Sequence, residues 1–276
     1  MTAFVAAYDT EKPEACLESC KRIARVHRDV GAPGTFFIVG KLLEEQGKKF
    51  CDLLDEPDLF EIASHTYSHK LLRDNAVCGR AVPPEVAHAE IVRSKQLVEE
   101  VFERPCLGLR PAVSFETGLS GAPELVEEVA NAGYKYVSSR AWGPDCSLPA
   151  PLEQAYNYAD EGHPEIWEFP CHGWHENVLK GHNAVPRRLL LWPPVYPELQ
   201  QTRLVKTVEQ EFEIHRFFLD RALTDNLEYV SLIWHPWSLM KFDPEMRMPR
   251  MVFEYARGQG MELVRFDDLW RRRAQH

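Results

Sequence analysis

Two histidines lie four residues apart in the segment FEIASHTYSHKLL, which spans residues 60–72. His65 and His69 follow a short apolar run and are separated by Thr, Tyr and Ser. Neutral imidazoles are the commonest metal ligands in proteins, and two of them on one turn can hold the same ion. The pair therefore indicates a metal site, although two polar residues at the end of a strand would explain the same letters.

Two carboxylates, Asp9 and Glu11, follow another apolar run near the start of the chain. Two histidines and one carboxylate leave coordination positions open for water and substrate, which is the arrangement of a catalytic metal. Hydrolysis at such a centre also needs a base that takes a proton from water. The two carboxylates could supply both groups, although acidic residues also suit the first turn of a helix.

Two more ionisable residues follow apolar runs. Arg110 in CLGLRPA would hold a nearby Asp9 ionised and oriented, with a surface salt bridge as the alternative. His235 lies in SLIWHPW between two tryptophans. Apolar surroundings lower the pKa of an imidazole and a nearby carboxylate raises it, so either setting can prepare His235 to act as a general acid. A buried histidine with satisfied hydrogen bonds is the alternative.

The order of the predicted elements explains how these residues would meet. Apolar runs typical of strands alternate about seven times with segments of helical periodicity. The predicted strands cover residues 3–9, 34–40, 59–65, 106–112, 134–139, 165–171 and 227–235, and the predicted helices cover 14–31, 41–56, 83–103, 122–133, 207–226 and 249–260. This alternation is typical of an α/β protein with a parallel sheet, and seven or eight such units fit a TIM-like (β/α) barrel.

The active sites of such barrels lie at the C-terminal ends of the strands. The candidate residues all lie within a few residues of the C-terminal ends of predicted strands, so we expect their side chains to meet at one mouth. Residues 142–197 are irregular and rich in Pro, Trp and His, and we expect them to form an excursion over that mouth. The whole chain, residues 1–276, is expected to form a single catalytic domain.

The composition limits the classes of partner. The 276 residues carry a formal net charge of −10, and 45% of them are hydrophobic, as in ordinary globular proteins. An acidic chain argues weakly against nucleic acid or an anionic membrane as partner, while an oligomer stays possible. The first residues show no features of a secretion signal, and no apolar run is long enough to span a bilayer, so we expect a cytoplasmic protein. The seven cysteines are expected to be free thiols.

Together these motifs resemble those of the polysaccharide deacetylase family, the NodB-like carbohydrate esterases. GTFFIVG is similar to the family's second strand, SHTYSH to its metal motif, GLRPA to its Arg-Pro motif, and SLIWHPW to its final leucine–histidine motif. The order and spacing of the motifs cover nearly the whole chain. The resemblance implies a distorted (β/α) barrel, usually of seven strands, and a metal-dependent N-deacetylase.

The family's roles carry over by position. The resemblance implies that His65 and His69 bind a divalent metal, with zinc as the expected ion. It implies that Asp9 is the base that deprotonates a metal-bound water, that Arg110 orients Asp9, and that His235 protonates the leaving amine. The metal and a backbone N–H after the Arg-Pro motif would stabilise the oxyanion. The expected reaction removes an N-acetyl group from an amino-sugar-containing small molecule or oligosaccharide.

The chain departs from the family's pattern in the motif after the first strand and in the Arg-Pro motif. Thr10 stands where the family has a second aspartate, so Glu11 becomes the candidate for the third metal ligand. The Arg-Pro motif continues as Ala112-Val113-Ser114 instead of Pro, an aromatic residue and Gly, which would reshape the acyl pocket.

A third departure concerns the partner of the proposed acid. Ala141 replaces the aspartate that is usual near Trp142. The carboxylate partner of His235 is therefore open, with Asp145 and Glu168 as candidates.

Trp142, Trp174 and His172 are the candidates for substrate contact, because aromatic rings in the excursion can stack on sugar rings. Core packing explains such tryptophans equally well, and a surface loop explains His172 and His175 better than a site does. Two other functions stay open: hydrolysis of another C–N bond, as in a cyclic amide or ureide, and glycan binding without turnover. An acid and a base together argue against the last, because a binding module needs neither.

Overall fold

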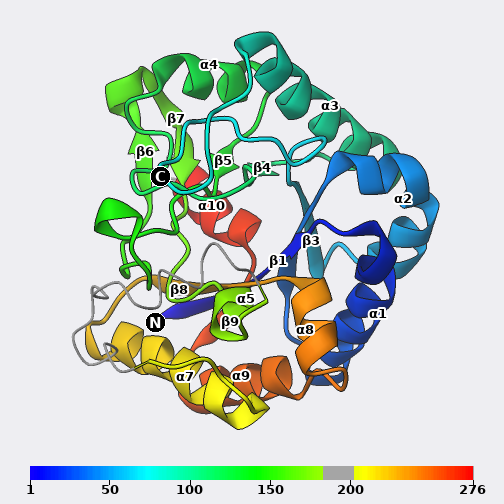
Figure 1. Ribbon diagram of the computed structural model, residues 1–276, viewed down its shortest axis with the longest axis vertical. Helices are drawn as coiled ribbons and strands as arrows, with labels where there is room; N and C mark the ends of the chain where they lie inside the picture. Colours follow the sequence, from blue (N-terminus) through cyan, green and yellow to red (C-terminus); the bar gives the residue numbers. More distant parts are fainter. Residues whose placement is uncertain (183–201, 276) are drawn as a thin grey trace.

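The computed structural model describes residues 1–182 and 202–275, whose strands form one mainly parallel sheet (Figure 1). The sheet has the order β6-β7-β5-β4-β3-β2-β1-β8. Seven of its parallel strands are β1 (Ala3–Thr10), β2 (Gly34–Ile38), β3 (Phe60–Ser64), β4 (Gly108–Leu109), β5 (Tyr136–Val137), β7 (His163–Glu168) and β8 (Tyr229–Trp234). Each overlaps a predicted strand, so the predicted α/β fold with about seven parallel strands is confirmed.

Two short strands complete the sheet. β6 (Tyr156–Tyr158) pairs antiparallel with β7 at one edge. β9 (Glu262–Val264) runs parallel to the first half of β1, while β2 pairs with its second half. A backbone bond from the His172 N–H to the Ser231 carbonyl connects the segment after β7 with β8, the strand at the other edge.

The long helices surround the strands in Figure 1. Six of them overlap the predicted helices: α1 (Pro13–Val30), α2 (Gly40–Leu54), α3 (Pro84–Phe102), α4 (Pro123–Asn131), α7 (Val208–Thr224) and α9 (Arg247–Gly258). Proline in the first turn of α1, α3 and α4 suits a position whose N–H has no partner within the helix. The sequence did not predict the shorter α5 (Glu176–Leu179), α8 (Pro236–Phe242) and α10 (Phe266–Ala274).

The predicted excursion at 142–197 is more regular than expected. Up to residue 182 it contains the 3₁₀ turns η1 (Pro144–Cys146) and η2 (Ala159–Glu161), together with β6, β7 and α5. The rest of it, residues 183–197, lies outside the described residues. No described helix is long and apolar enough to cross a membrane, and all seven cysteines are free thiols.

The sheet separates two apolar clusters. Alternate residues of β1 belong to one or the other: Phe4, Ala6 and Tyr8 to the cluster under the helices, and Ala3, Val5 and Ala7 to the cluster on the opposite, inner face. Phe266 and Leu269 of α10 extend the inner cluster. The N–H of Phe266 also donates to Thr35 Oγ1 at 3.2 Å, which ties α10 to β2.

Gly108 provides a sharp test of packing in the short strand β4. A Cβ at this position would lie 2.1 Å from both Cζ and Oη of Tyr136, a fully buried ring that donates to Glu61 at 2.6 Å. We expect Gly108→Ala to lower the free energy of unfolding by about 1–3 kcal/mol, because the core is overpacked. Gly258→Ala is the control: a Cβ at the end of α9 meets no atom within 4 Å. It should leave stability unchanged or raise it by up to about 1 kcal/mol. Equal denaturant unfolding curves for the two variants would contradict this account.

Candidate metal centre and active site

The inward face of β1 carries the first carboxylate to the mouth of the sheet. Asp9 continues the inward series of Ala3, Val5 and Ala7, because side chains alternate along a strand. Thr10 faces the other way, with Oγ1 4.0 Å from Cys20 Sγ on α1. Glu11 returns to the side of Asp9. Because side chains alternate along the strand, a carboxylate at position 11 lies on the same side as Asp9, whereas one at position 10 would face α1.

A strained turn after β3 brings the two histidines together. Thr66 and His69 have φ angles of 60° and 58°, in the left-handed region that few residues other than glycine adopt. Glu90 of α3 holds the turn, because its carboxylate accepts hydrogen bonds from the Ser68 backbone N–H at 2.6 Å and from the Ser68 hydroxyl. As a result, the ring centroids of His65 and His69 lie 4.8 Å apart.

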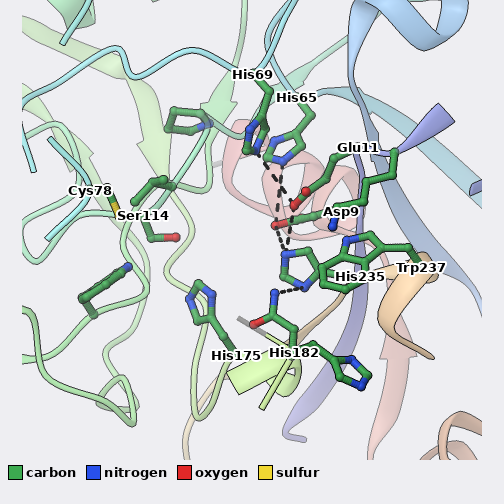
Figure 2. A pocket seen from close by; sticks show the side chains of 15 residues that line it. Asp9, Glu11, His65, His69, Cys78, Ser114, His175, His182, His235 and Trp237 are labelled. Carbon is green, nitrogen blue, oxygen red and sulfur yellow. Dashed lines mark hydrogen bonds and ion pairs between the residues drawn. The ribbon is translucent and has the colours of Figure 1, made fainter. Parts of the chain in front are cut away.

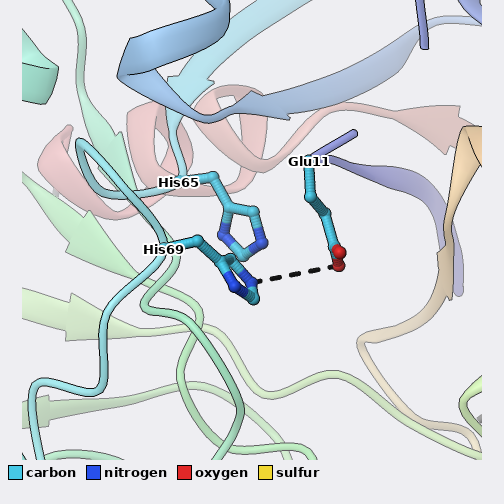
Figure 3. Close-up of side chains that lie close together, drawn as sticks. All are labelled: Glu11, His65 and His69. Atoms are coloured by element: carbon cyan, nitrogen blue, oxygen red, sulfur yellow. Dashed lines mark ion pairs between the residues drawn. The ribbon is translucent and has the colours of Figure 1, made fainter. Parts of the chain in front are cut away.

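Glu11, His65 and His69 offer three ligand atoms that all lie within 4.8 Å of one another (Figure 3). These are the three residues predicted as metal ligands. His65 Nδ1 lies 2.9 Å from the Arg110 carbonyl oxygen, so Nδ1 carries the proton, because a carbonyl can only accept.

The other nitrogen of His65 is suited to a metal. Nε2 is buried and has no hydrogen-bond partner among the described residues. Burial lowers the pKa of His65 to about 4, so the ring is neutral near pH 7 and Nε2 presents a lone pair. A free lone pair beside a carboxylate and a second imidazole fits a divalent cation.

Asp9 forms a buried ion pair with the predicted arginine. Asp9 Oδ1 lies 2.5 Å from Arg110 Nη1, and the two residues are 6% and 1% exposed. Burial alone would raise the pKa of Asp9, but Arg110 first, and then His65 and His235, hold it well below its usual range. The free Oδ2 lies 4.0 Å from Nε2 of both His65 and His235. An ionised carboxylate therefore stands between the candidate metal ligand His65 and the proposed acid His235.

His235, the predicted acid, follows β8 and lies between two carboxylates. Its Nε2 is 3.1 Å from Glu11 Oε1, and its Nδ1 is 3.1 Å from Glu176 Oε1. Burial would lower the pKa of His235, but Glu11 and Glu176 outweigh burial and raise it to about 10. The imidazole is therefore protonated at neutral pH in the metal-free protein.

Glu176 is the carboxylate partner that the sequence left open. Neither candidate contacts His235: Asp145 is exposed in η1, and Glu168 is buried and accepts from Ser139, Arg140 and Tyr158. Glu176 accepts instead from the His235 backbone N–H at 2.7 Å as well as from its ring. The sequence does contain one sign of a structural role for Glu176: Lys180 follows four residues later, a spacing that is typical of an ion pair within a helix.

A second buried ion pair supports Glu176. Lys180 Nζ lies 2.5 Å from Glu176 Oε2 and 3.0 Å from Glu211 Oε1, and all three side chains are fully buried. Burial would lower the pKa of Lys180, but the two carboxylates outweigh it and raise the pKa. Lys180 therefore stays charged and fixes Glu176 from the side opposite His235.

These groups line a pocket of about 420 Å³ (Figure 2). Of the three predicted substrate-binding residues, Trp142 lines this pocket and the other two do not. Trp174 is 1% exposed within the outer apolar cluster. His172 is buried and connects the loop after β7 to its neighbours, through the Glu153 carbonyl at 2.7 Å and the Ser231 N–H at 3.0 Å.

The expectation of surface histidines in this loop was wrong. His172 is 2% exposed, and His175 lines the pocket. The loop after β7 packs against β8 and so buries polar residues such as His172. The hydrophobic pattern of the sequence does not predict such packing.

Residues 8–137 match the family model described as "Polysaccharide deacetylase". This match confirms the resemblance to the polysaccharide deacetylase family. The family acts on carbon–nitrogen amide bonds, so the predicted enzyme class, a hydrolase of such bonds other than peptide bonds, is confirmed at that level. No curated protein matches the sequence.

Solved structures with the same fold include deacetylases. A putative polysaccharide deacetylase from Mycobacterium smegmatis aligns with a TM-score of 0.65 and 18% identity over 99% of this chain and 91% of that chain. A probable polysaccharide deacetylase from Pseudomonas aeruginosa aligns with a TM-score of 0.64 and 15% identity over 98% of this chain and 89% of that chain. PuuE allantoinase aligns with a TM-score of 0.63 and 14% identity over 98% of this chain and 88% of that chain. These similarities confirm the predicted distorted barrel.

The metal ligands can be tested directly. We expect about one divalent ion per chain in the wild type and loss of most of it in His65→Ala, because one of three ligands is removed. His88→Ala is the matched control, since His88 is an exposed residue that pairs with Glu128. Elemental analysis after dialysis measures the metal content. Equal metal in the wild type and His65→Ala would exclude this site.

Proposed function

We propose that this protein is a metal-dependent hydrolase that removes the N-acetyl group from an amino-sugar-containing substrate. One observation carries the proposal: three potential metal ligands, an ionised carboxylate and a protonated histidine surround a single pocket. Asp9 Oδ2 lies 4.0 Å from the free nitrogens of both His65 and His235. This layout suits general acid–base catalysis, because it places a base and an acid on either side of the bond that is broken.

A divalent cation, with zinc as the expected ion, would be held by His65, His69 and Glu11. When bound it would act as a Lewis acid that polarises the acyl oxygen and makes water more acidic. The mixed nitrogen and oxygen ligand set, with open positions, suits zinc.

Asp9 takes the proton of the attacking water. Arg110 holds Oδ1, and Oδ2 is left on the side of His65. The same arginine depresses the pKa of Asp9, so the carboxylate is ionised and ready, although it is a weak base. Arg110 thus orients the Asp9 carboxylate, but by lowering its pKa it also makes Asp9 a weaker base.

His235 supplies the second proton. Glu176 holds Nδ1, and Nε2 lies at the pocket 3.1 Å from Glu11 Oε1, from where it donates its proton to the departing amine. Water gives one proton to Asp9, His235 gives one to nitrogen, and the products are acetate and a free amine. The acyl side of the pocket is the segment after Arg110: Pro111, Val113 and Ser114 line it, and Val113 has a φ of 65°. We assign the oxyanion donor to a backbone N–H of this segment.

Hydrolysis of a cyclic amide or ureide is the second candidate. PuuE allantoinase shares the fold, and the same base and acid would serve to open a ring. A glycan-binding barrel without turnover is the third candidate. A cytoplasmic location and a single catalytic domain over residues 1–276 stay predictions.

Three substrates separate these candidates. The zinc-loaded protein is incubated with N-acetylglucosamine, with its oligomers and with allantoin, and acetate release and ring opening are measured. Acetate from an amino sugar, without ring opening, is the expected result. Ring opening alone would favour the second candidate, and neither reaction by the metal-bound protein would contradict a catalytic role.

The departure in the first motif predicts two different failures. Asp9→Asn keeps the shape but cannot accept a proton, so metal content should survive while turnover falls by about 10²–10⁴-fold. Glu11→Gln removes the anionic ligand, so metal affinity should fall first and excess metal should restore part of the activity. Metal affinity and acetate release are measured for both. Wild-type affinity in Glu11→Gln would remove Glu11 from the ligand set.

The buried carboxylates around Lys180 predict a matched pair of variants. Glu176→Gln and Glu211→Gln each leave Lys180 with one partner, so both should lower the free energy of unfolding by up to about 3–5 kcal/mol. Only Glu176 contacts His235. We therefore expect kcat to fall about 10–100-fold in Glu176→Gln alone, with KM little changed. Equal kcat values for the two folded variants would show that Glu176 only stabilises the fold.

A further inference from the structure

One wall of the pocket carries polar atoms that the proposed mechanism does not use. Trp142 and His175 both line this wall. Their rings are in edge contact, with centroids 6.2 Å apart. Figure 2 shows His175 pointing into the pocket from the side opposite His65 and His69.

Each of the two rings has one unpaired atom. Trp142 Nε1 and His175 Nε2 are buried and have no hydrogen-bond partner in residues 1–182 and 202–275. Trp142 is only 3% exposed. Buried polar atoms of native proteins are nearly always paired, so two unpaired atoms on adjacent rings of a pocket wall point to a ligand that pairs them.

The two atoms differ in chemistry. An indole N–H can only donate. The other nitrogen of His175 bonds to the Ala141 backbone, and burial first, then His235, lowers the pKa of His175 to about 4. The imidazole is therefore neutral, with its proton on the nitrogen that faces the Ala141 carbonyl. Nε2 of His175 is left as an acceptor.

A hydroxyl group matches this pair, because it donates one hydrogen bond and accepts others through the same oxygen. The His175 ring lies 6.4 Å from the His235 ring, so a group bound by His175 would lie on the side of the pocket where the proposed acid stands.

We propose that Trp142 and His175 form a subsite for one ring hydroxyl of the amino sugar, on the side of the leaving amine. The subsite rests on the proposed deacetylase function and names the feature of the substrate that the pocket selects. It accounts for a pocket of about 420 Å³, which is near the lower end of the range for small-molecule sites. Specificity would then come from a single sugar ring.

Monodeoxy analogues of N-acetylglucosamine test the subsite. The zinc-loaded wild type should hydrolyse the parent sugar with a kcat/KM about 10–100-fold above that of one analogue, the one that lacks the bound hydroxyl. Trp142→Phe and His175→Phe should lose this preference, because they slow the parent sugar and leave that analogue nearly unchanged.

Trp174→Phe is the matched control. Trp174 also has an unpaired indole N–H, but it lies in the apolar core and does not line the pocket. Its replacement should keep the preference among the analogues. Metal content and thermal midpoint are measured for every variant, so that loss of metal or of folding is recognised.

Two outcomes would overturn the subsite: a wild type that treats all analogues alike, or a Trp142→Phe variant that keeps the wild-type preference. If the wild type releases no acetate from any sugar, the proposed function fails separately. Calorimetric binding of glucosamine and its monodeoxy analogues then decides. The subsite is supported if Trp142→Phe weakens binding only of the sugars that carry the selected hydroxyl. It is overturned if no sugar binds, or if Trp142→Phe weakens the binding of all of them equally.

Discussion

The buried ion pair between Arg110 and Asp9 is the interaction on which the pocket depends. Taking two charges out of water is costly, and such a pair persists only where geometry and further hydrogen bonds compensate. Arg110 meets this condition: its Nη1 lies 2.5 Å from Asp9, its Nη2 donates to Ser138 at 3.0 Å, and its guanidinium lies 4.0 Å from the Phe37 ring. Its backbone carbonyl meanwhile accepts from His65. One residue therefore directs a carboxylate with its side chain and a candidate metal ligand with its main chain.

Charge balance extends the same constraint across the pocket. His235 and Lys180 are cations buried between carboxylates, and each lies within 3.1 Å of Glu176. Glu211 completes the row on the far side of Lys180. Removing any member leaves an uncompensated buried charge, which costs far more than the loss of one surface pair. The proposed acid is thus oriented by a network that the fold cannot rearrange cheaply.

The sequence could predict the parts of the site that depend on local periodicity. Alternation of strands and helices placed Asp9, His65, Arg110 and His235 at one mouth, because parallel strands end at the same side of a sheet. The meeting of His65 with His69 depends instead on left-handed residues and on a distant glutamate, so spacing could suggest it but not establish its geometry. Roles set by tertiary packing were missed, because the sequence does not reveal which aromatic and polar residues of a long loop face inward.

Glu176 illustrates how a missing side chain is replaced from elsewhere in the fold. The family's pattern has an aspartate where this chain has Ala141, and no carboxylate at 141 can serve His235. The Ala141 backbone instead bonds His175, the residue directly before Glu176. Glu176 then reaches both the ring and the backbone N–H of His235. The side chain proposed to bind the substrate and the carboxylate that contacts the proposed acid are thus neighbours in sequence, and one short segment places both at the pocket.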